Sequence, residues 1–180
     1  GFSLKLFDDA LKMNGYTSSA IDFEGDWSLS TRHKSVSNTD SRSLDNTPVW
    51  EGASDRLVVR GTRHAVYVDF RPWTFGVRVA LIDSPLTCRQ IPQYCRLFQV
   101  DGSSYVDLEI VVSEGDLSVR VNGEVWRPSE VPPPPSRPNT LAFGNFVHGL
   151  VGAKSISQWD RIHLNASGHE ATPIAHWPLD

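Results

Sequence analysis

Strict alternation of apolar and polar residues before a tight-turn signal constrains the fold of this chain more than any other feature. Residues 117–121 read LSVRV, and this period of two is typical of a β-strand with one buried face and one exposed face. Asn122-Gly123 follows. This pair tolerates the positive φ angles of a type I′ turn, so the chain is predicted to reverse into a strand at 124–126. The segment therefore predicts a β-hairpin whose register is set by its turn.

Similar runs recur along the chain. Residues 105–112 are a further strand candidate, which Glu114-Gly115-Asp116 would turn into the hairpin. Other strand-like segments are DRLVVRG, HAVYVDF, TFGVRVALID, RLFQVD, NTLAFGN, SISQWDRIHL and TPIAHWPLD. The first of these lie about 8 to 12 residues apart, as strands do in sandwiches and barrels. Because each sheet has to bury its apolar face, the sequence predicts an all-β fold, a two-sheet antiparallel β-sandwich with minimal helix.

Three segments do not follow this pattern. LFDDALKMNGY, with Asp8 as a cap and Gly15 as a stop, predicts one or two helical turns. Residues 30–55 are crowded with Ser, Thr, Asn and Asp, which favour loops, and we expect an exposed polar loop there. The prolines within 130–138 cannot join a sheet and predict a stiff crossover. A docking motif for an aromatic-lined groove is the alternative for these prolines.

The 180 residues are enough for one domain, 1–180, that buries roughly 70% of the surface of its unfolded chain. Alternation along the strands predicts which side chains face its core. They are Val58, Val66, Val68, Phe75, Val77, Val79, Leu81, Phe98, Leu108, Ile110, Val119, Val121, Leu141, Phe143, Ile162 and Leu164.

Charge and hydropathy exclude two classes of partner. The net charge is −4 and the Lys and Arg residues are scattered, so no basic stripe is available for nucleic acid. No apolar run approaches the ~20 residues that span a bilayer, and we expect no membrane insertion.

Two cysteines, Cys88 and Cys95, enclose six residues. In an oxidising compartment they could close a disulfide loop worth about 2.5 kcal/mol, and in a reducing one they would be two thiols. Both alternatives stay open. Their spacing is not C-x-x-C, which argues against metal or redox catalysis.

The order WTFGVRVALID, RLFQVDGSSYVDLEIVVSEGDLSVRVNGEVW, NTLAFGN and LVGAKSISQWDRIHLN, across 73–165, resembles the second half of a laminin-G or concanavalin A-like lectin/glucanase domain. The resemblance covers about half of the chain. It implies a jelly-roll, lectin-like sandwich with function on loops or on the concave sheet.

Sandwich glucanases suggest an enzyme, because a retaining mechanism needs two carboxyl groups about 5 to 5.5 Å apart. Asp107 and Glu109 are two apart and share a strand face, but such a pair is more often part of an exposed outer face. The six histidines are dispersed, and no G-x-S-x-G elbow or phosphate loop occurs. We expect no enzymatic activity, with a polysaccharide-degrading enzyme as an alternative.

Sugar sites need aromatic faces with fixed polar groups nearby. The residues that we expect to bind ligand are Tyr94, Trp73, Trp126, Asn145 and His148. Tyr94, inside the cysteine loop, is the best placed, whereas Trp73 and Trp126 could instead pack in the core. For a metal, Asp83 and Asp101 are candidate Ca²⁺ ligands, with no cofactor as the alternative.

Taken together, these features favour a non-catalytic binding or attachment module with carbohydrate as the leading ligand class. The alternative is a structural virion or fibre assembly module that docks on a protein neighbour or forms a homo-oligomer. An extracellular, cell-surface or virion location is expected for either.

Overall fold

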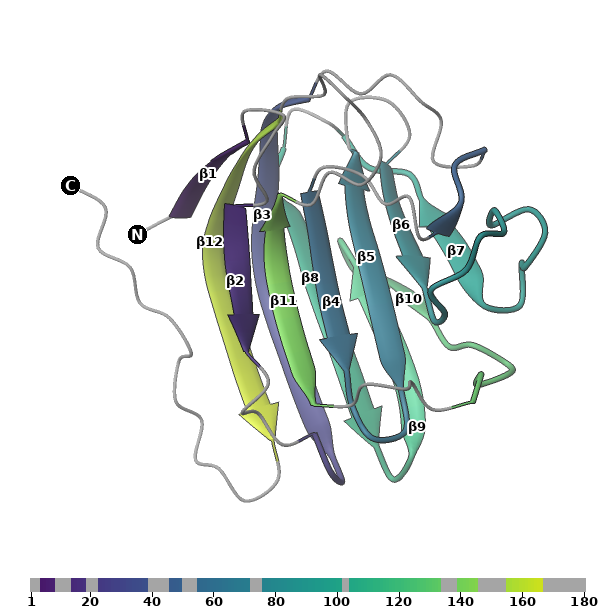
Figure 1. Ribbon diagram of the computed structural model, residues 1–180. Helices are drawn as coiled ribbons and strands as arrows, with labels where there is room; N and C mark the ends of the chain where they lie inside the picture. Colours follow the sequence, from purple (N-terminus) through teal and green to yellow (C-terminus); the bar gives the residue numbers. More distant parts are fainter. Residues whose placement is uncertain are drawn as a thin grey trace.

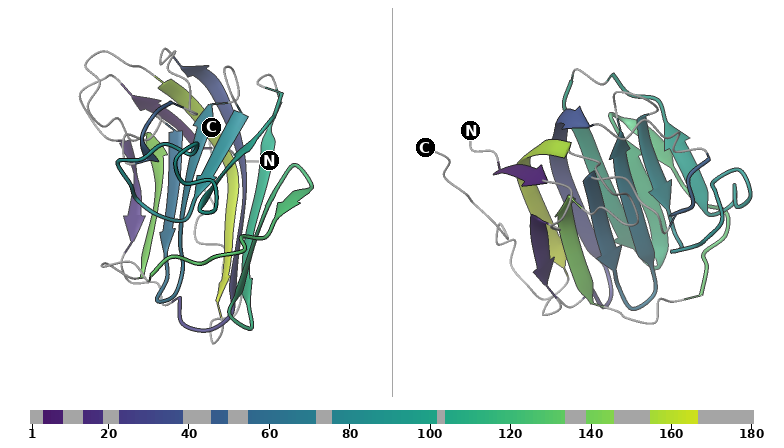
Figure 2. Two further views of the ribbon diagram at one scale, coloured as in Figure 1. Left: turned by 90° about the vertical axis from the view of Figure 1, so that its right-hand side faces the viewer. Right: turned by 45° about the horizontal axis from the view of Figure 1, so that its top comes forward.

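Two antiparallel sheets of six strands each pack face to face in the computed structural model (Figure 1). It describes residues 4–8, 14–18, 23–38, 46–49, 55–71, 76–101, 104–133, 139–145 and 155–166. These residues include no α-helix, and no helix among them is long and apolar enough to cross a bilayer. The predicted all-β, two-sheet antiparallel sandwich is confirmed, and its two layers are seen edge-on in Figure 2.

Sheet A contains, in spatial order, β1 (Leu4–Asp8), β12 (Ser155–Ala166), β3 (Trp27–Asn38), β8 (Val106–Ser113), β9 (Asp116–Val121) and β10 (Glu124–Trp126). Sheet B contains β2 (Asn14–Ser18), β11 (Thr140–Asn145), β4 (Asp55–Arg60), β5 (Ala65–Arg71), β6 (Gly76–Ala80) and β7 (Cys95–Phe98). The segment that contains the prolines joins β10 of sheet A to β11 of sheet B.

The meander β8–β9–β10 has the predicted turns. Asn122 and Gly123 have φ angles of 48° and 85°, as a type I′ turn requires. Asn122 also fixes the turn to β8, because its side-chain Oδ1 accepts the Asp107 N–H at 2.8 Å while its own N–H donates to the Asp107 carbonyl at 2.9 Å. The Glu114-Gly115 turn has positive φ angles as well, 53° and 87°.

The core lies between the sheets. Every side chain predicted for it belongs to the main apolar cluster, with two exceptions. Phe75 lies outside the described residues, and Val58 is buried on the opposite face of sheet B. In β4 it is Leu57 and Val59 that face the core. Alternation did not reveal this because both faces of β4 are covered.

The exposed loop predicted for 30–55 was wrong over 30–38, which belong to β3 between β12 and β8. Thr31, His33 and Ser35 alternate along its inner face and are buried. Small polar residues on a buried face hid the strand, because Ser and Thr are more typical of loops. The last residue of the expected loop, Asp55, begins β4. The prediction of exposure was also wrong at Thr47 and Val49, which are buried. Residues 39–45 and 50–54 of the expected loop lie outside the described residues.

The prediction of a short helix was wrong at both of its ends. Asp8, its expected cap, ends β1, and Gly15, its expected stop, lies within β2. β1 pairs with β12 and β2 with β11, so pairing with a sheet outweighs the local helical signal. The strand candidate TPIAHWPLD lies outside the described residues.

Candidate functional site

Three charged residues lie side by side on the outer face of sheet B, the face turned away from the core. Arg56 of β4 is in register with Asp69 of β5, and Asp69 with Arg78 of β6. Each lies between core-facing residues of its own strand, so all three point outward. We call Arg56, Asp69 and Arg78 the arginine row.

The row is a buried ion network. The Arg56 Nε lies 2.9 Å from Asp69 Oδ1, and the Arg78 Nε and Nη2 lie 2.8 Å and 2.6 Å from Asp69 Oδ2. The side chains of Asp69 and Arg78 are fully buried. Burial acts to raise the pKa of Asp69, but the charges of Arg56, Arg78 and Arg71 outweigh it and hold that pKa below its ordinary value. Asp69 is therefore ionised and holds two guanidinium groups in place.

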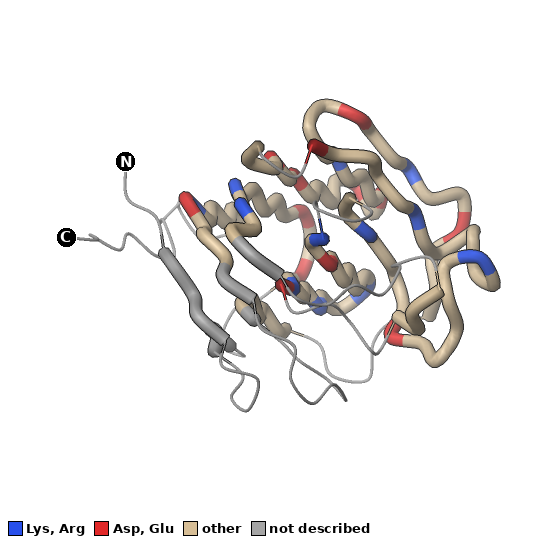
Figure 3. Tube along the Cα trace, turned by 90° about the horizontal axis from the view of Figure 1, so that it is seen from above, with Lys and Arg blue, Asp and Glu red and all other residues tan. Residues whose placement is uncertain are grey.

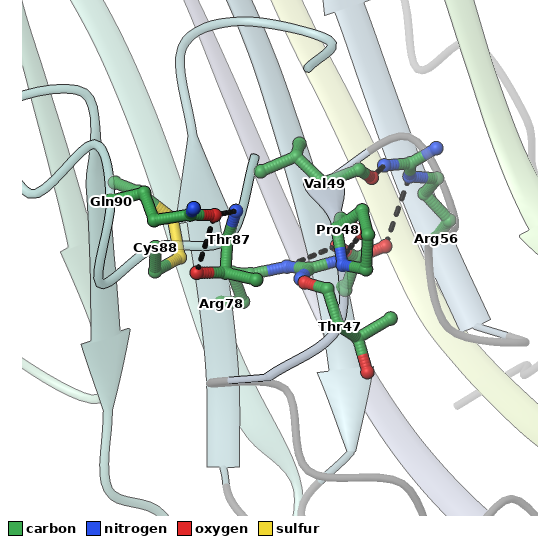
Figure 4. Close-up of a disulfide and its surroundings, with 10 residues drawn as sticks. Thr47, Pro48, Val49, Arg56, Arg78, Thr87, Cys88 and Gln90 are labelled. Atoms are coloured by element: carbon green, nitrogen blue, oxygen red, sulfur yellow. Dashed lines mark hydrogen bonds and ion pairs between the residues drawn. A yellow bond between two sulfur atoms is a disulfide. The ribbon is translucent and has the colours of Figure 1, made fainter. Parts of the chain in front are cut away.

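A short stretch of backbone, Asn46–Val49, crosses over the row, and we call it the covering segment (Figure 4). Arg78 donates from Nη1 to the Thr47 carbonyl at 2.6 Å and from Nη2 to the Pro48 carbonyl at 3.4 Å. Arg56 donates from Nη2 to the Val49 carbonyl. On its other side, the Val49 N–H donates to the Leu86 carbonyl at 3.1 Å.

A second apolar cluster lies beside the row on the same face. We call it the outer cluster, and it comprises Val49, Val58, Ala65, Tyr67, Ala80, Cys88, Ile91, Cys95 and Ala142. Cys88 and Cys95 are joined by a disulfide with a Cα–Cα distance of 5.1 Å. Because Cys95 is the first residue of β7, the disulfide ties the loop between β6 and β7 to the sheet.

The outer face of sheet B is accessible to solvent at Arg60. The Arg60 Nε donates to the Tyr67 hydroxyl at 3.1 Å, and its Nη2 lies 3.9 Å from the Asp83 carboxylate. The Arg60 side chain is 25% exposed and can meet a ligand. Guanidinium groups of Arg56 and Arg60 lie 5.6 Å and 5.5 Å from the centre of the Tyr67 ring. Because this ring is also buried, the face offers nitrogen donors rather than an aromatic platform.

Positive charge gathers on this face. Arg71 follows the core-facing Phe70 in β5, so it points outward with Arg56, Arg60 and Arg78. On β4, β5 and β6 these four arginines share the outer face with one acid, Asp69. The whole chain has a net charge of −4, and the other charged residues of the described part lie on strands of both sheets and on loops (Figure 3).

Of the predicted ligand-binding residues, two are described with their side chains. Tyr94 is half-buried and packs against both clusters, and partial desolvation together with a hydrogen bond to Glu130 raises the pKa of its hydroxyl. Trp126 is 8% exposed and belongs to the main core. Asn145 ends β11 opposite Asp55. Trp73, His148 and the side chain of Asn145 lie outside the described residues.

The two candidate metal ligands lie on the surface. Asp83 is beside Arg60, and Asp101 accepts the Ser104 hydroxyl at 3.3 Å. Within the ranges that the structure describes, no group of three or more His, Cys, Asp or Glu side chains is arranged to hold a metal ion.

Asp107 and Glu109, weighed as a catalytic pair, share the outer face of sheet A as expected. Asp107 lies 3.6 Å from the Arg32 guanidinium, and Glu109 accepts from Arg120 at 2.8 Å. Both acids are solvent-accessible and face a cation.

The arginine row was not predicted from the sequence. Its signal was the presence of charged residues in three strands that are otherwise mostly apolar, DRLVVR, AVYVDFR and GVRVA. Strands that are apolar throughout are typically covered on both faces, so a charge inside them has to be paired.

No family model matches the chain, and no curated protein matches it. Among solved structures, it is similar to alginate lyase A1-II', a member of polysaccharide lyase family 7, with 14% identity over 80% of this chain and 63% of that one and a TM-score of 0.49. The receptor binding domain of botulinum neurotoxin type G shares 8% identity over 89% of this chain and 40% of that one, with a TM-score of 0.45. The legume lectin-like domain from Entamoeba histolytica shares 10% identity over 80% and 74%, with a TM-score of 0.44.

The chain therefore spans less than two thirds of the alginate lyase and less than half of the toxin domain. No conclusion about ligand or activity follows from likeness at this level.

Proposed function

We propose that this chain is a non-catalytic carbohydrate-binding module and that it binds its ligand on the outer face of sheet B. The observation that carries this proposal is the gathering of four arginines on one face of a chain with a net negative charge, where Arg60 is partly exposed and Arg56, Arg71 and Arg78 are buried. Sugars present oxygen acceptors, and guanidinium groups are planar donors that bind such oxygens in pairs. Because Asp69 already fixes two of these groups, little side-chain freedom is lost on binding.

Several contacts favour binding over catalysis. Asp69 is engaged by two arginines, and Asp107 and Glu109, which lie on sheet A, each face an arginine of that same sheet. The two arginines hold the pKa of Asp69 below its ordinary value, so Asp69 stays ionised and lacks the protonated state that a general acid needs. The Cys88–Cys95 disulfide supports the further proposal of an extracellular or virion location, where disulfides persist.

Replacing Arg60 at the open edge tests the binding face. Titration calorimetry with a panel of oligosaccharides should show Arg60→Ala binding about tenfold more weakly than the natural chain, because a charged donor is lost. The matched control is Arg120→Ala on sheet A, whose guanidinium is also surface-exposed and faces an acid. It should bind like the natural chain. Melting temperatures should be nearly equal.

Two results would contradict this proposal. Weakening by Arg120→Ala alone would move the binding face to sheet A. If no oligosaccharide binds while sedimentation shows a stable homo-oligomer, the structural assembly alternative would replace carbohydrate binding.

A further inference from the structure

We propose that the arginine row is a binding site for negatively charged glycans, and that the covering segment occupies this site when no ligand is bound. The inference rests on the proposed function and adds to it the chemical class of the ligand and a closed state of the site. Carboxylated and sulfated sugars share the chemistry that the row would recognise.

The covering segment already shows what the row binds. Three successive carbonyl oxygens, those of Thr47, Pro48 and Val49, accept from the two guanidinium groups of the row. The two arginines lie on strands separated by one intervening strand, so their backbones are roughly 10 Å apart. The row therefore binds an extended chain that presents oxygen atoms along its length. An oligosaccharide laid across β4, β5 and β6 would present its oxygens in the same way.

The charge of the row favours an anion over these carbonyls. The donors of the row are two guanidinium groups, each of which carries a permanent positive charge and contacts Asp69. Peptide carbonyls are neutral acceptors, whereas a carboxylate or sulfate forms charge-assisted bonds that are roughly twice as strong. Burial strengthens this difference, because the local dielectric constant is low. A charged sugar therefore gains more than a neutral one by replacing the segment.

Displacing the segment also has a cost. Besides the three carbonyl bonds, the Val49 N–H is bonded to the Leu86 carbonyl, and the Val49 side chain is fully buried in the outer cluster. If binding needs the open state, the apparent affinity falls by the fraction of molecules that are open. Loosening the segment should therefore tighten binding without touching the arginines.

The first test is Val49→Ala in the full chain. It removes apolar contacts of the covering segment and should tighten the binding of a uronic acid oligosaccharide by about tenfold. Val36→Ala makes the same change at a side chain that is 42% exposed, and it should leave the affinity unchanged. A sulfated neutral-backbone oligosaccharide should behave like the uronic acid one.

The second test uses the unaltered chain and does not depend on the stability of a variant. Amide exchange followed by NMR should show the Val49 N–H exchanging faster when the uronic acid oligosaccharide saturates the protein, because its bond to Leu86 is broken. The Gly61 N–H, bonded to the His64 carbonyl at 2.8 Å, should be unaffected.

The outcomes separate this inference from the proposed function. If neutral and charged oligosaccharides of equal length bind equally well, or if binding leaves Val49 exchange unchanged, the inference is overturned and carbohydrate binding stands. If neither kind of oligosaccharide binds, both are overturned.

Discussion

His64 joins the two sheets at one end of the sandwich through a single hydrogen bond. It is 5% exposed, and its Nε2 lies 3.0 Å from the Gly115 carbonyl in the turn between β8 and β9. A carbonyl accepts only, so Nε2 carries the proton. The ring also lines a pocket of about 130 Å³ with Asp26 and Glu114. Burial lowers the pKa of His64, and the hydrogen bond to Gly115 opposes this only in part.

The lowered pKa makes folding stability depend on pH. Below about pH 6.5 the unfolded chain takes up a proton at His64 more readily than the folded chain, so the free energy of unfolding falls as the pH decreases. Above that pH, His64 is neutral in both states and the free energy of unfolding keeps its full value. Urea unfolding should show that the free energy of unfolding falls less between about pH 7.5 and about pH 5 for His64→Gln than for the natural chain. His163→Gln, at an exposed position, is the control. Equal losses in the natural chain and His64→Gln would rule out this role.

At the scale of elements, a strand could be predicted when apolar and polar residues alternate along it, because the alternation indicates which face is buried. In β8 and β9 exposed residues alternate with buried ones, and the Asn-Gly pair allowed only one tight turn. β3 escaped prediction because His33 and Ser35 are buried, and their burial depends on strands far away in the sequence. The arginine row escaped for a related reason. Arg56 and Arg78 look like surface residues until a segment from another part of the chain covers them.

The loop between β6 and β7 has its own contacts besides the disulfide. The Leu81 N–H donates to the Tyr94 carbonyl at 2.8 Å, and the Thr87 N–H donates to the Gln90 side chain at 2.9 Å. The ring closed by Cys88 and Cys95 is short, so on the chain-entropy model the disulfide adds only about 2.5 kcal/mol to the free energy of unfolding. The core between the sheets does not depend on it.

Replacing both cysteines by serine should therefore loosen this loop alone. Amide exchange of Leu81 should become faster, whereas that of Asp107, bonded to Asn122, should not change, and unfolding should remain one cooperative step. Titration of unfolded, unreduced protein should find no free thiol. Two titratable thiols, or loss of cooperative unfolding in the double variant, would show that the loop has a different role.

At the scale of the whole molecule, a polar contact crosses the interface between the sheets. The Nε2 of His33, in β3, lies 3.4 Å from the Asp55 carboxylate, in β4, and both side chains are fully buried. The His33 ring also stacks on Phe70, with 4.1 Å between ring centres, and meets Trp159 edge-on at 4.6 Å. A buried carboxylate needs such a partner, because its desolvation is otherwise uncompensated. The two sheets are thus held in register by more than apolar contact.

A pair of variants measures what this contact contributes. His33→Leu keeps much of the volume but leaves Asp55 facing an apolar group, and it should lower the free energy of unfolding by roughly 2 to 4 kcal/mol. His33→Leu with Asp55→Leu removes both polar groups and should recover part of that loss, since replacing both partners of a buried pair by apolar residues is often tolerated. Urea unfolding of the three chains gives the comparison. If the double variant is less stable than His33→Leu by the full cost of Asp55→Leu alone, the two residues are independent, and the sheets are held together by the apolar core without help from this pair.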